Sequence, residues 1–178
     1  MTTREFMPAH IAVITVSDTR TPETDKSGDT LCERITKAGH HLTSRAIVKD
    51  EVRQIRAAVR KLTKRADVDV IITTGGTGLT GRDVTVEALR PLFDKEIEGF
   101  GVVFHMISFQ KINTSTIQSR ATAGVMAGKY VFCLPGSPGA CKDAWDEILL
   151  HQLDYRHHPC NFIEIMPRLD EHLTRKKG

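Results

Sequence analysis

The sequence predicts an α/β protein, a three-layer α/β/α sandwich built around a mostly parallel sheet. Short apolar runs rich in β-branched residues alternate along the chain with longer segments of helical periodicity. The apolar runs show little alternation with polar residues, which is typical of strands buried on both faces. Right-handed crossovers would place helices on both sides of such a sheet. With 178 residues, the chain (1–178) is expected to form a single domain, with a core at about 9–163 and flexible terminal tails.

The first β and α elements are predicted near the N-terminus. Residues 11–16 (IAVITV) form a buried strand that ends in a polar loop. Ser27 is the expected N-cap of the first helix. The helix is expected to stop at Gly39, because glycine readily takes the left-handed conformation that follows a helix end.

A second βα pair and a third strand follow. Residues 42–48 read as a strand, and Asp50 is placed to cap a helix whose apolar stripe lies within 52–62. Residues 68–72 (VDVII) alternate only weakly between apolar and polar residues and are mostly β-branched, so they are predicted to form a third buried strand. A glycine-rich turn comes directly after it.

The C-terminal half continues the alternation. Residues 84–112 read as helical, with breaks near Pro91 and at 99–101. Residues 130–134 (YVFCL) form another buried strand, paired with 122–126 through a two-residue turn.

The last long helix is expected to start at a proline. Ser137 serves as its N-cap and Pro138 occupies the first helical position, where a missing N–H costs nothing. Trp145 lies beside its apolar face. Residues 161–165 are read as a final strand that follows a loop.

Composition excludes several classes of function. The formal net charge is +3, and basic and acidic residues are interleaved, so no basic patch or stripe points to nucleic acid. No apolar run approaches a membrane span, and the N-terminus lacks the apolar core of a secretory signal. We therefore expect a cytoplasmic protein without nucleic-acid or membrane partners. The four cysteines are expected to be reduced, buried thiols; Cys160, although it follows two histidines, lacks the second ligand pair of a zinc site.

The glycine-rich turn is the segment that most strongly suggests chemistry. The third strand ends in Thr73-Thr74, and Gly75-Gly76-Thr77-Gly78 follows. Such a turn can direct several backbone N–H groups at one anion. Asp83 lies close enough to bring a carboxylate, which a magnesium–phosphate site needs and a bare anion site does not. The simpler interpretation is a tight strand-to-helix turn that needs glycine for its geometry alone.

Polar residues also follow the other predicted strands. Ser17 and Asp18 follow the first strand, Asp50 follows the second, and residues 135–137 follow the strand at 130–134. Because ligands in open α/β sheets bind outside the carboxyl ends of the strands, these segments are expected to meet at one rim of the sheet.

In that order, the motifs resemble a known family. TVSDTR (15–20), DKSGD (25–29), TTGGTGLTGRD (73–83), EGFG (98–101), SR (119–120) and LPGSP (134–138) are similar to the MoaB/Mog proteins of molybdenum cofactor biosynthesis. The resemblance covers about residues 9–163 and is closest to the MoaB branch. It implies the same three-layer fold and assembly as trimers, or as hexamers made of two trimers.

The resemblance also implies an activity, that of a molybdopterin adenylyltransferase. Such an enzyme transfers AMP from Mg²⁺-bound ATP to the terminal phosphate of molybdopterin and releases pyrophosphate. The two aspartates on which Mog-type members depend align with Asp50 and Asp83, which we expect to be catalytic and to hold Mg²⁺. A molybdate-insertion enzyme that receives the product is a candidate partner.

The remaining candidate residues are those that would contact phosphate, nucleotide or molybdopterin. They are Ser17, Asp18, Thr74, Gly75, Gly76, Thr77, Gly78, Arg120, Pro135, Gly136 and Ser137. Ser137 and the helix that follows it offer a second anion pocket, assigned to molybdopterin. Simpler interpretations stay open: Asp50 and Asp83 as helix caps, and Arg120 as a member of an ion pair.

Two other functions and one interface are also considered. A non-catalytic molybdopterin-binding or scaffold protein, or another phosphate-ester enzyme such as a nucleotide-modifying hydrolase, could share this fold. A trimer interface is expected on the helix at 99–112, because Phe100, Val103, Phe104 and Ile107 exceed one buried stripe.

Overall fold

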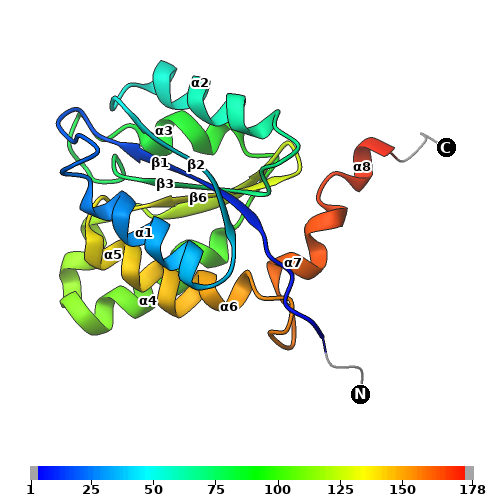
Figure 1. Cartoon of the computed structure of the whole chain (residues 1–178). Coiled ribbons are helices and arrows are strands. Elements are labelled where there is room, and N and C mark those ends of the chain that lie inside the picture. The colour runs from blue at the N-terminus through cyan, green and yellow to red at the C-terminus, as the bar shows by residue number, and fades with distance from the viewer. Residues whose placement is uncertain (1–3, 175–178) are drawn as a thin grey trace.

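The computed structural model describes residues 4–174. The tails expected to be flexible include residues 1–3 and 175–178, which lie outside the described part. Within it, a twisted six-stranded sheet separates two layers of helices, as predicted (Figure 1). None of the described helices is both long and apolar enough to cross a membrane.

The sheet has the strand order β2-β1-β3-β6-β5-β4. Its strands are β1 (His10–Val16), β2 (His41–Val48), β3 (Val70–Thr74), β4 (Lys95–Glu96), β5 (Thr122–Met126) and β6 (Lys129–Leu134). Strands β2, β1, β3 and β6 lie next to one another in this order and run parallel. Strand β5 is antiparallel to both of its neighbours, β6 and β4. The predicted hairpin between β5 and β6 is therefore confirmed.

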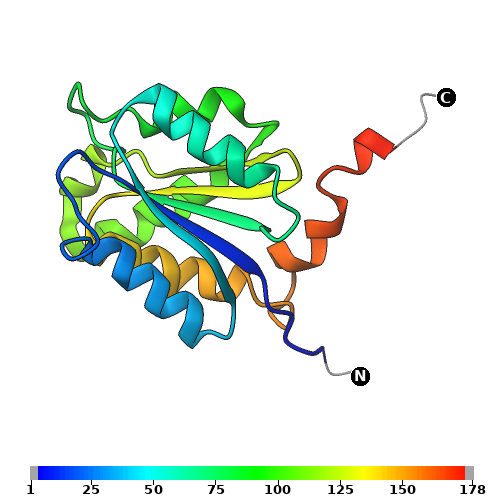
Figure 2. The same cartoon turned by 45° about the horizontal axis from the view of Figure 1, so that its top comes forward.

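Helices cover both faces of the sheet (Figures 1 and 2). They are α1 (Lys26–Lys37), α2 (Val52–Thr63), α3 (Thr85–Leu89), α4 (Glu98–Ile112), α5 (Pro138–Ala144), α6 (Leu150–Gln152), α7 (Phe162–Ile165) and α8 (Glu171–Thr174). A π-helical segment (Trp145–Leu149) joins α5 to α6, and 3₁₀ turns cover Arg90–Leu92, Asn113–Gln118 and Met166–Arg168.

Each face of the sheet has its own apolar core. On one face, α1, α4 and α5 pack around the fully buried Trp145 and Phe132. On the other, α2 and α3 contribute Ile55, Val59 and Leu89. Side chains alternate between the faces along each strand, so a single strand such as β1 supplies both cores. Burial on both faces explains why the strands read as continuous apolar runs.

Several predicted boundaries are wrong. Asp25, not Ser27, caps α1, and its Oδ1 accepts from Gly28 N at 3.0 Å. Asp50 does not cap α2, because Glu51 holds the N-cap position and makes no side-chain cap bond. Residues 161–165 do not form a strand: Asn161 caps the short helix α7 by accepting from Glu164 N at 2.8 Å.

The segment 84–112 also differs from its prediction. The break near Pro91 exists, and the chain there forms a 3₁₀ turn and the short strand β4. Helix α4, however, runs unbroken through the glycines at 99–101. A Cβ at Gly101 would stand 2.9 Å from the carbonyl oxygen of Ala121, so glycine here permits close packing of the helix on the neighbouring chain.

The predicted self-association surface needs revision. Phe100 and Phe104 are 3% and 2% exposed and belong to the core, so they cannot contact a second copy. The apolar side chains that α4 and the adjoining 3₁₀ turn do expose are Val102, Val103, Met106, Phe109, Ile112 and Ile117.

The cysteines are free, but not all are buried. Cys133 and Cys141 are buried, and burial raises the pKa of the two thiols to about 12 and about 11. Cys32 is half-buried and Cys160 is exposed, so the prediction of four buried thiols fails at these two positions.

Candidate functional site

The carboxyl ends of the parallel strands meet at one rim of the molecule, as the sequence predicted. The rim consists of the β1 loop (17–25), Asp50 after β2, the glycine turn (75–78) after β3, and residues 135–137 after β6. Register fixes their relative heights, since Thr15 of β1, Thr74 of β3 and Leu134 of β6 lie side by side. Segments distant in sequence thereby come together.

The glycine turn needs its glycines for two separate reasons. Gly75 and Gly76 have φ values of +102° and +68°, which side-chain-bearing residues rarely adopt. Space is also lacking: a Cβ at Gly75 would stand 2.2 Å from the carbonyl oxygen of Val16. From the other side, a Cβ at Gly136 would stand 3.1 Å from the Cα of Gly75. The turns after β3 and β6 therefore touch backbone to backbone.

The carboxylates of Asp50 and Asp83 both lie against this turn. A Cβ at Gly76 would stand 2.9 Å from Asp50 Oδ1, and one at Gly78 would stand 2.8 Å from Asp83 Oδ2. Asp50 Oδ1 accepts from Val84 N at 3.2 Å, and Asp83 Oδ2 accepts from Thr80 N at 2.9 Å. Neither side chain caps a helix in the way considered from the sequence.

The electrostatics of Asp50 reflect this crowding. Burial raises the pKa of Asp50 above its usual value, and the negative charges of Asp83 and Asp18 raise it further. A cation placed between the carboxylates would relieve both effects, because it replaces lost hydration and screens like charges.

The carboxylates at the rim suit Mg²⁺ better than a metal held by protein ligands alone. Among the described residues, no group of three or more His, Cys, Asp or Glu side chains is arranged to hold a metal ion by itself. Mg²⁺ does not require such a cage, since it is commonly held by one or two carboxylates together with substrate phosphates and water. Asp50 Oδ2 and Asp83 Oδ1, the oxygens not used in the hydrogen bonds above, fit this pattern.

A cleft of about 360 Å³ opens beside the glycine turn. Its lining residues come from three segments: Gly76, Thr77, Gly78, Asp83, Ser115, Gln118, Ser119, Pro135, Gly136 and Ser137. No role was assigned from the sequence to the 3₁₀ turn at 113–118, and Ser119 was noted only as part of a motif. Ser119 Oγ is buried without a hydrogen-bond partner among the described residues, so it offers an unused polar group next to the cleft.

Two hydroxyl residues from the prediction hold the turns in place. Ser137 caps α5, its Oγ accepting from Ala140 N at 3.2 Å, and it also lines the cleft. Thr74 is fully buried, and its Oγ1 donates to the carbonyl oxygen of Pro135 at 2.9 Å. In this structure Thr74 joins the turns after β3 and β6.

Arg120 braces the glycine turn from behind. Its Nε donates to the carbonyl oxygen of Gly78 at 2.9 Å and its Nη2 to that of Asp83 at 3.1 Å. The same guanidinium forms an ion pair with Glu87. The ion-pair interpretation of Arg120 is thus confirmed, and its contacts fix the conformation of the turn that carries Asp83.

A second ion pair crosses the rim. Asp18 accepts from Arg82 Nε at 2.9 Å, and its other oxygen accepts from Asp50 N at 3.3 Å. The Arg82 guanidinium lowers the pKa of Asp18. Sequence reasoning did not single out Arg82, although a cation directly before Asp83 was a signal that could have been used. Ser17 and Asp18 also line a larger cavity, together with residues 45–49.

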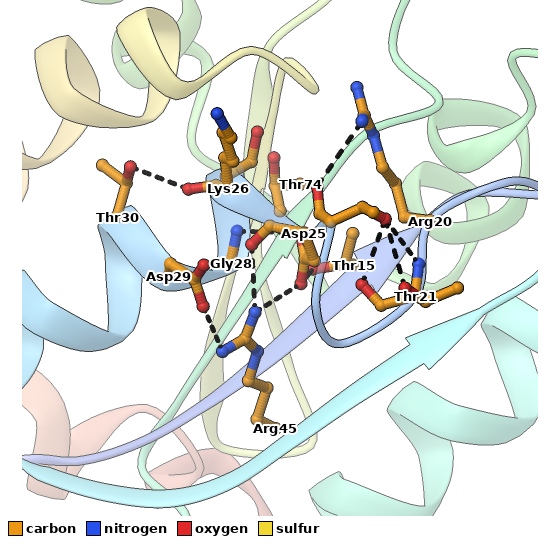
Figure 3. A network of polar contacts seen from close by, with 12 residues as sticks. Thr15, Arg20, Thr21, Asp25, Lys26, Gly28, Asp29, Thr30, Arg45 and Thr74 are labelled. Atoms are coloured by element: carbon orange, nitrogen blue, oxygen red, sulfur yellow. Dashed lines mark hydrogen bonds and ion pairs between the residues drawn. The ribbon is translucent and has the colours of Figure 1, made fainter.

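The β1 loop is anchored by a buried carboxylate (Figure 3). Asp25, 1% exposed at its side chain, accepts from Thr15 Oγ1 and Arg45 Nη2, both at 2.8 Å. Burial alone would raise the pKa of Asp25, but the hydrogen bonds from Arg45, Gly28 and Thr15 outweigh it and lower the pKa. Next to it, Ser27 Oγ donates to the carbonyl oxygen of Gly136 at 2.9 Å, which ties α1 to the cleft.

The fold and this rim define an α/β protein in which the glycine turn and Asp83 line a cleft at the carboxyl ends of the strands, while Asp50 lies against the same turn. Residues 12–155 match the family described as a probable molybdopterin binding domain. Molybdenum cofactor biosynthesis protein B of Escherichia coli K12 is 52% identical over 158 residues, which cover 89% of this chain and 93% of that protein. The chain therefore belongs to the MoaB-type family of molybdenum cofactor biosynthesis proteins.

Solved structures agree with this assignment. A crystal structure of molybdenum cofactor biosynthesis protein B superimposes with a TM-score of 0.85 at 43% identity, covering 94% of this chain and 99% of the other. The tungsten cofactor synthesizing protein MoaB from Pyrococcus furiosus gives a TM-score of 0.72 at 34% identity, covering 94% and 98%. The resemblance noted in the motifs is confirmed.

Proposed function

We propose that this protein acts in the cytoplasm as a molybdopterin adenylyltransferase, which transfers AMP from ATP to the terminal phosphate of molybdopterin. The observation that carries the proposal is that two carboxylates lie against one glycine turn, that of Asp50 at Gly76 and that of Asp83 at Gly78. A structural turn requires neither carboxylate, and both are held by backbone N–H groups in fixed positions.

The reaction needs no nucleophile from the protein. A phosphate oxygen of molybdopterin attacks the α-phosphorus of ATP, a new P–O bond forms, and the bond to the leaving pyrophosphate breaks. A phosphate monoester has a second pKa of about 6, so the nucleophile is mostly dianionic at neutral pH. The main barrier lies in bringing two anions together and in neutralising charge as pyrophosphate leaves.

The residues of the rim divide this work. Backbone N–H groups of the glycine turn would hold phosphate oxygens, and Asp50 and Asp83 would hold Mg²⁺. The ion, when bound, supplies positive charge that offsets the charge of the phosphates. Arg120 keeps the turn in the binding conformation through its bonds to two carbonyl oxygens. The cleft with Ser119 and Ser137 is the place we assign to the molybdopterin phosphate.

Turnover by an Asp83→Asn variant tests the proposal. The substitution keeps an oxygen for the Thr80 bonds and removes the charge, so we expect the fold and molybdopterin binding to persist. AMP transfer should fall by about 10²–10³-fold, the usual loss when one electrostatic contact to the transition state is removed. Asp67→Asn is a matched control, because Asp67 precedes β3 at the opposite end of the strand and forms its ion pair with the nearby Arg65.

Release of pyrophosphate from ATP in the presence of molybdopterin and Mg²⁺ gives the readout. Turnover of the Asp83→Asn variant close to that of the unmodified protein would remove Asp83 from the mechanism. Tight binding of molybdopterin by the unmodified protein without any pyrophosphate release would identify a non-catalytic binding protein instead.

A further inference from the structure

A third carboxylate lies near the glycine turn, on the side away from the cleft. It belongs to Glu87 of α3 and forms an ion pair with Arg120. The Glu87 side chain is 51% exposed and is not among the residues that line the cleft. The hydrogen bond from Arg120 lowers the pKa of Glu87, so the carboxylate is charged at neutral pH. The role of this pair depends on what else the guanidinium holds.

The guanidinium of Arg120 closes the loop at 77–83 from both ends. At the start of the loop, its Nε donates to the carbonyl oxygens of Thr77 at 3.3 Å and Gly78 at 2.9 Å. At the end of the loop, its Nη2 donates to the carbonyl oxygen of Asp83 at 3.1 Å. One side chain thereby fixes the separation of the two ends, and with it the position of the Asp83 carboxylate beside the glycine turn.

Glu87 fixes the orientation in which the guanidinium makes these bonds. Arginine presents five N–H donors in a planar fork, and the three carbonyl oxygens engage only Nε and Nη2. Glu87 engages the rest of the fork: its Oε1 pairs with Nη1, and its Oε2 accepts from Nη2 at 3.3 Å. Such a two-point contact adds geometric specificity to the pair. Without Glu87, Nη1 would keep no hydrogen-bond partner in the described part of the chain.

Glu87 can serve as an anchor because α3 is itself held firmly. The next residue, Ala88, is fully buried in the core on this face of the sheet. At the start of α3, Thr85 N donates to the carbonyl oxygen of Gly76 at 2.9 Å. The ion pair therefore connects the loop at 77–83 to an element that is bound both to the core and to the glycine turn.

We propose that Glu87 is a positioning residue for AMP transfer, which acts through Arg120 to hold Asp83 where its carboxylate can bind Mg²⁺. This inference rests on the proposed function for the identity of the reaction. Glu87 touches neither substrate nor metal, so its influence reaches the reaction only through the position of Asp83.

Charge and position predict different effects when Glu87 is neutralised. Loss of a negative charge near an anion site makes the local potential more positive, so a phosphate ligand should bind as well as before or more tightly. A loosened loop should instead weaken Mg²⁺ binding and slow AMP transfer, because the rate depends on placement of the groups that hold the reactants. Slower transfer without weaker anion binding therefore identifies positioning, whereas a purely electrostatic role would leave the rate intact.

Glu87→Gln is the test variant and Glu96→Gln is its matched control. Each substitution removes the charge of a carboxylate that pairs with an arginine, Arg120 in the first case and Arg90 in the second. Glu96 lies on β4, and its hydrogen bonds go to Arg90 and Thr122 rather than to the loop. Because exposed pairs contribute little stability, the Tm of Glu87→Gln should lie within about 3 °C of that of the unmodified protein.

Hydrogen exchange, measured by NMR on the protein without ligands, reports on the loop independently of activity. Thr80 N donates to Asp83 Oδ2 and Asp83 N donates to the carbonyl oxygen of Thr80, so both amides are bonded within the loop. In Glu87→Gln we expect these amides to exchange at least about fivefold faster, because the loop opens more often. In Glu96→Gln their exchange should be unchanged.

Pyrophosphate release and calorimetry give the functional readouts. In Glu87→Gln, kcat should fall about tenfold and the Mg²⁺ concentration that gives half the maximal rate should rise. The Kd of tripolyphosphate, measured without Mg²⁺, should stay the same or decrease. In the Asp83→Asn background, Glu87→Gln should slow transfer by less than about twofold, because residues that act as one unit are not additive.

The inference is overturned if Glu87→Gln behaves like Glu96→Gln in exchange and rate, or if it slows transfer equally in both Asp83 backgrounds. Weaker tripolyphosphate binding in Glu87→Gln would also overturn it. Its failure is distinguishable from that of the proposed function. Absence of pyrophosphate release from the unmodified protein would refute the proposed function, while faster loop exchange in Glu87→Gln would still show that Glu87 holds the loop. Normal transfer by Glu87→Gln would refute the role of Glu87 alone.

Discussion

Removing the buried carboxylate of Asp25 should destabilise the protein far more than removing its exposed neighbour Asp29, although both bind the same guanidinium. Arg45 donates to Asp25 Oδ2 at 2.8 Å and to Asp29 Oδ1 at 2.7 Å. The Asp25 side chain is 1% exposed and that of Asp29 is 57% exposed. The contact distances alone would therefore predict an equal loss of stability in the two variants, whereas the difference in burial predicts a much larger loss for Asp25.

The magnitude follows from the groups left behind. In Asp25→Ala, Gly28 N and Thr15 Oγ1 lose their acceptor and Arg45 loses its buried partner. Breaking a buried pair costs about 3–5 kcal/mol. Because Arg45 is 28% exposed and keeps Asp29, we take the lower end, about 3 kcal/mol. Asp29→Ala should cost about 0–1 kcal/mol, as for an exposed ion pair.

Thermal and urea unfolding measure the difference. For a domain of this size, about 3 kcal/mol corresponds to a decrease in Tm of roughly 6–12 °C. The pKa of Asp25 is lowered in the folded state, so its stabilising effect is complete at neutral pH and is lost as pH falls below about 4. The difference in the free energy of unfolding between the unmodified protein and the Asp25→Asn variant should therefore become smaller at acidic pH. Equal melting of Asp25→Ala and Asp29→Ala would refute the reasoning.

Two further outcomes are expected. In Asp83→Asn the pKa of Asp50 should move down toward its usual value, because a neighbouring negative charge is removed; an NMR titration of Asp50 checks this, and an unchanged or higher pKa would contradict it. The exposed apolar face of α4 should mediate assembly into trimers or hexamers, so Met106→Asp should yield monomers in light scattering, while Lys95→Asp on β4 should not. A monomeric unmodified protein would reject this interface.

Much of the fold could be predicted because it depends on local patterns. The buried strands appear as apolar runs, and the parallel arrangement brings their carboxyl ends together whatever the lengths of the loops. That is why Asp50 and Asp83 could be placed at one rim although 32 residues and a helix separate them. The conformation of the glycine turn followed from residue types that tolerate positive φ.

What could not be predicted depends on tertiary partners. Asp25 and Ser27 are equally good caps by type, and the choice of Asp25 depends on Arg45, which arrives from β2. The run at 161–165 is apolar enough for a strand, yet Asn161 caps a short helix there and Ile163 packs into the core from it. The role of Arg82 depends on its hydrogen bond to Asp18, a residue 64 positions away in the sequence, which no local pattern indicates.

The backbone contact between Gly75 and Gly136 limits how the molecule can be altered. No side chain lies between the two turns: a Cβ added at Gly136 would press on the Cα of Gly75, and one added at Gly75 would collide with the backbone of Val16. Redesign of the cleft for a larger ligand could not begin at these glycines. Enlargement would have to start at the 113–118 segment, whose side chains frame the opening and can be shortened individually.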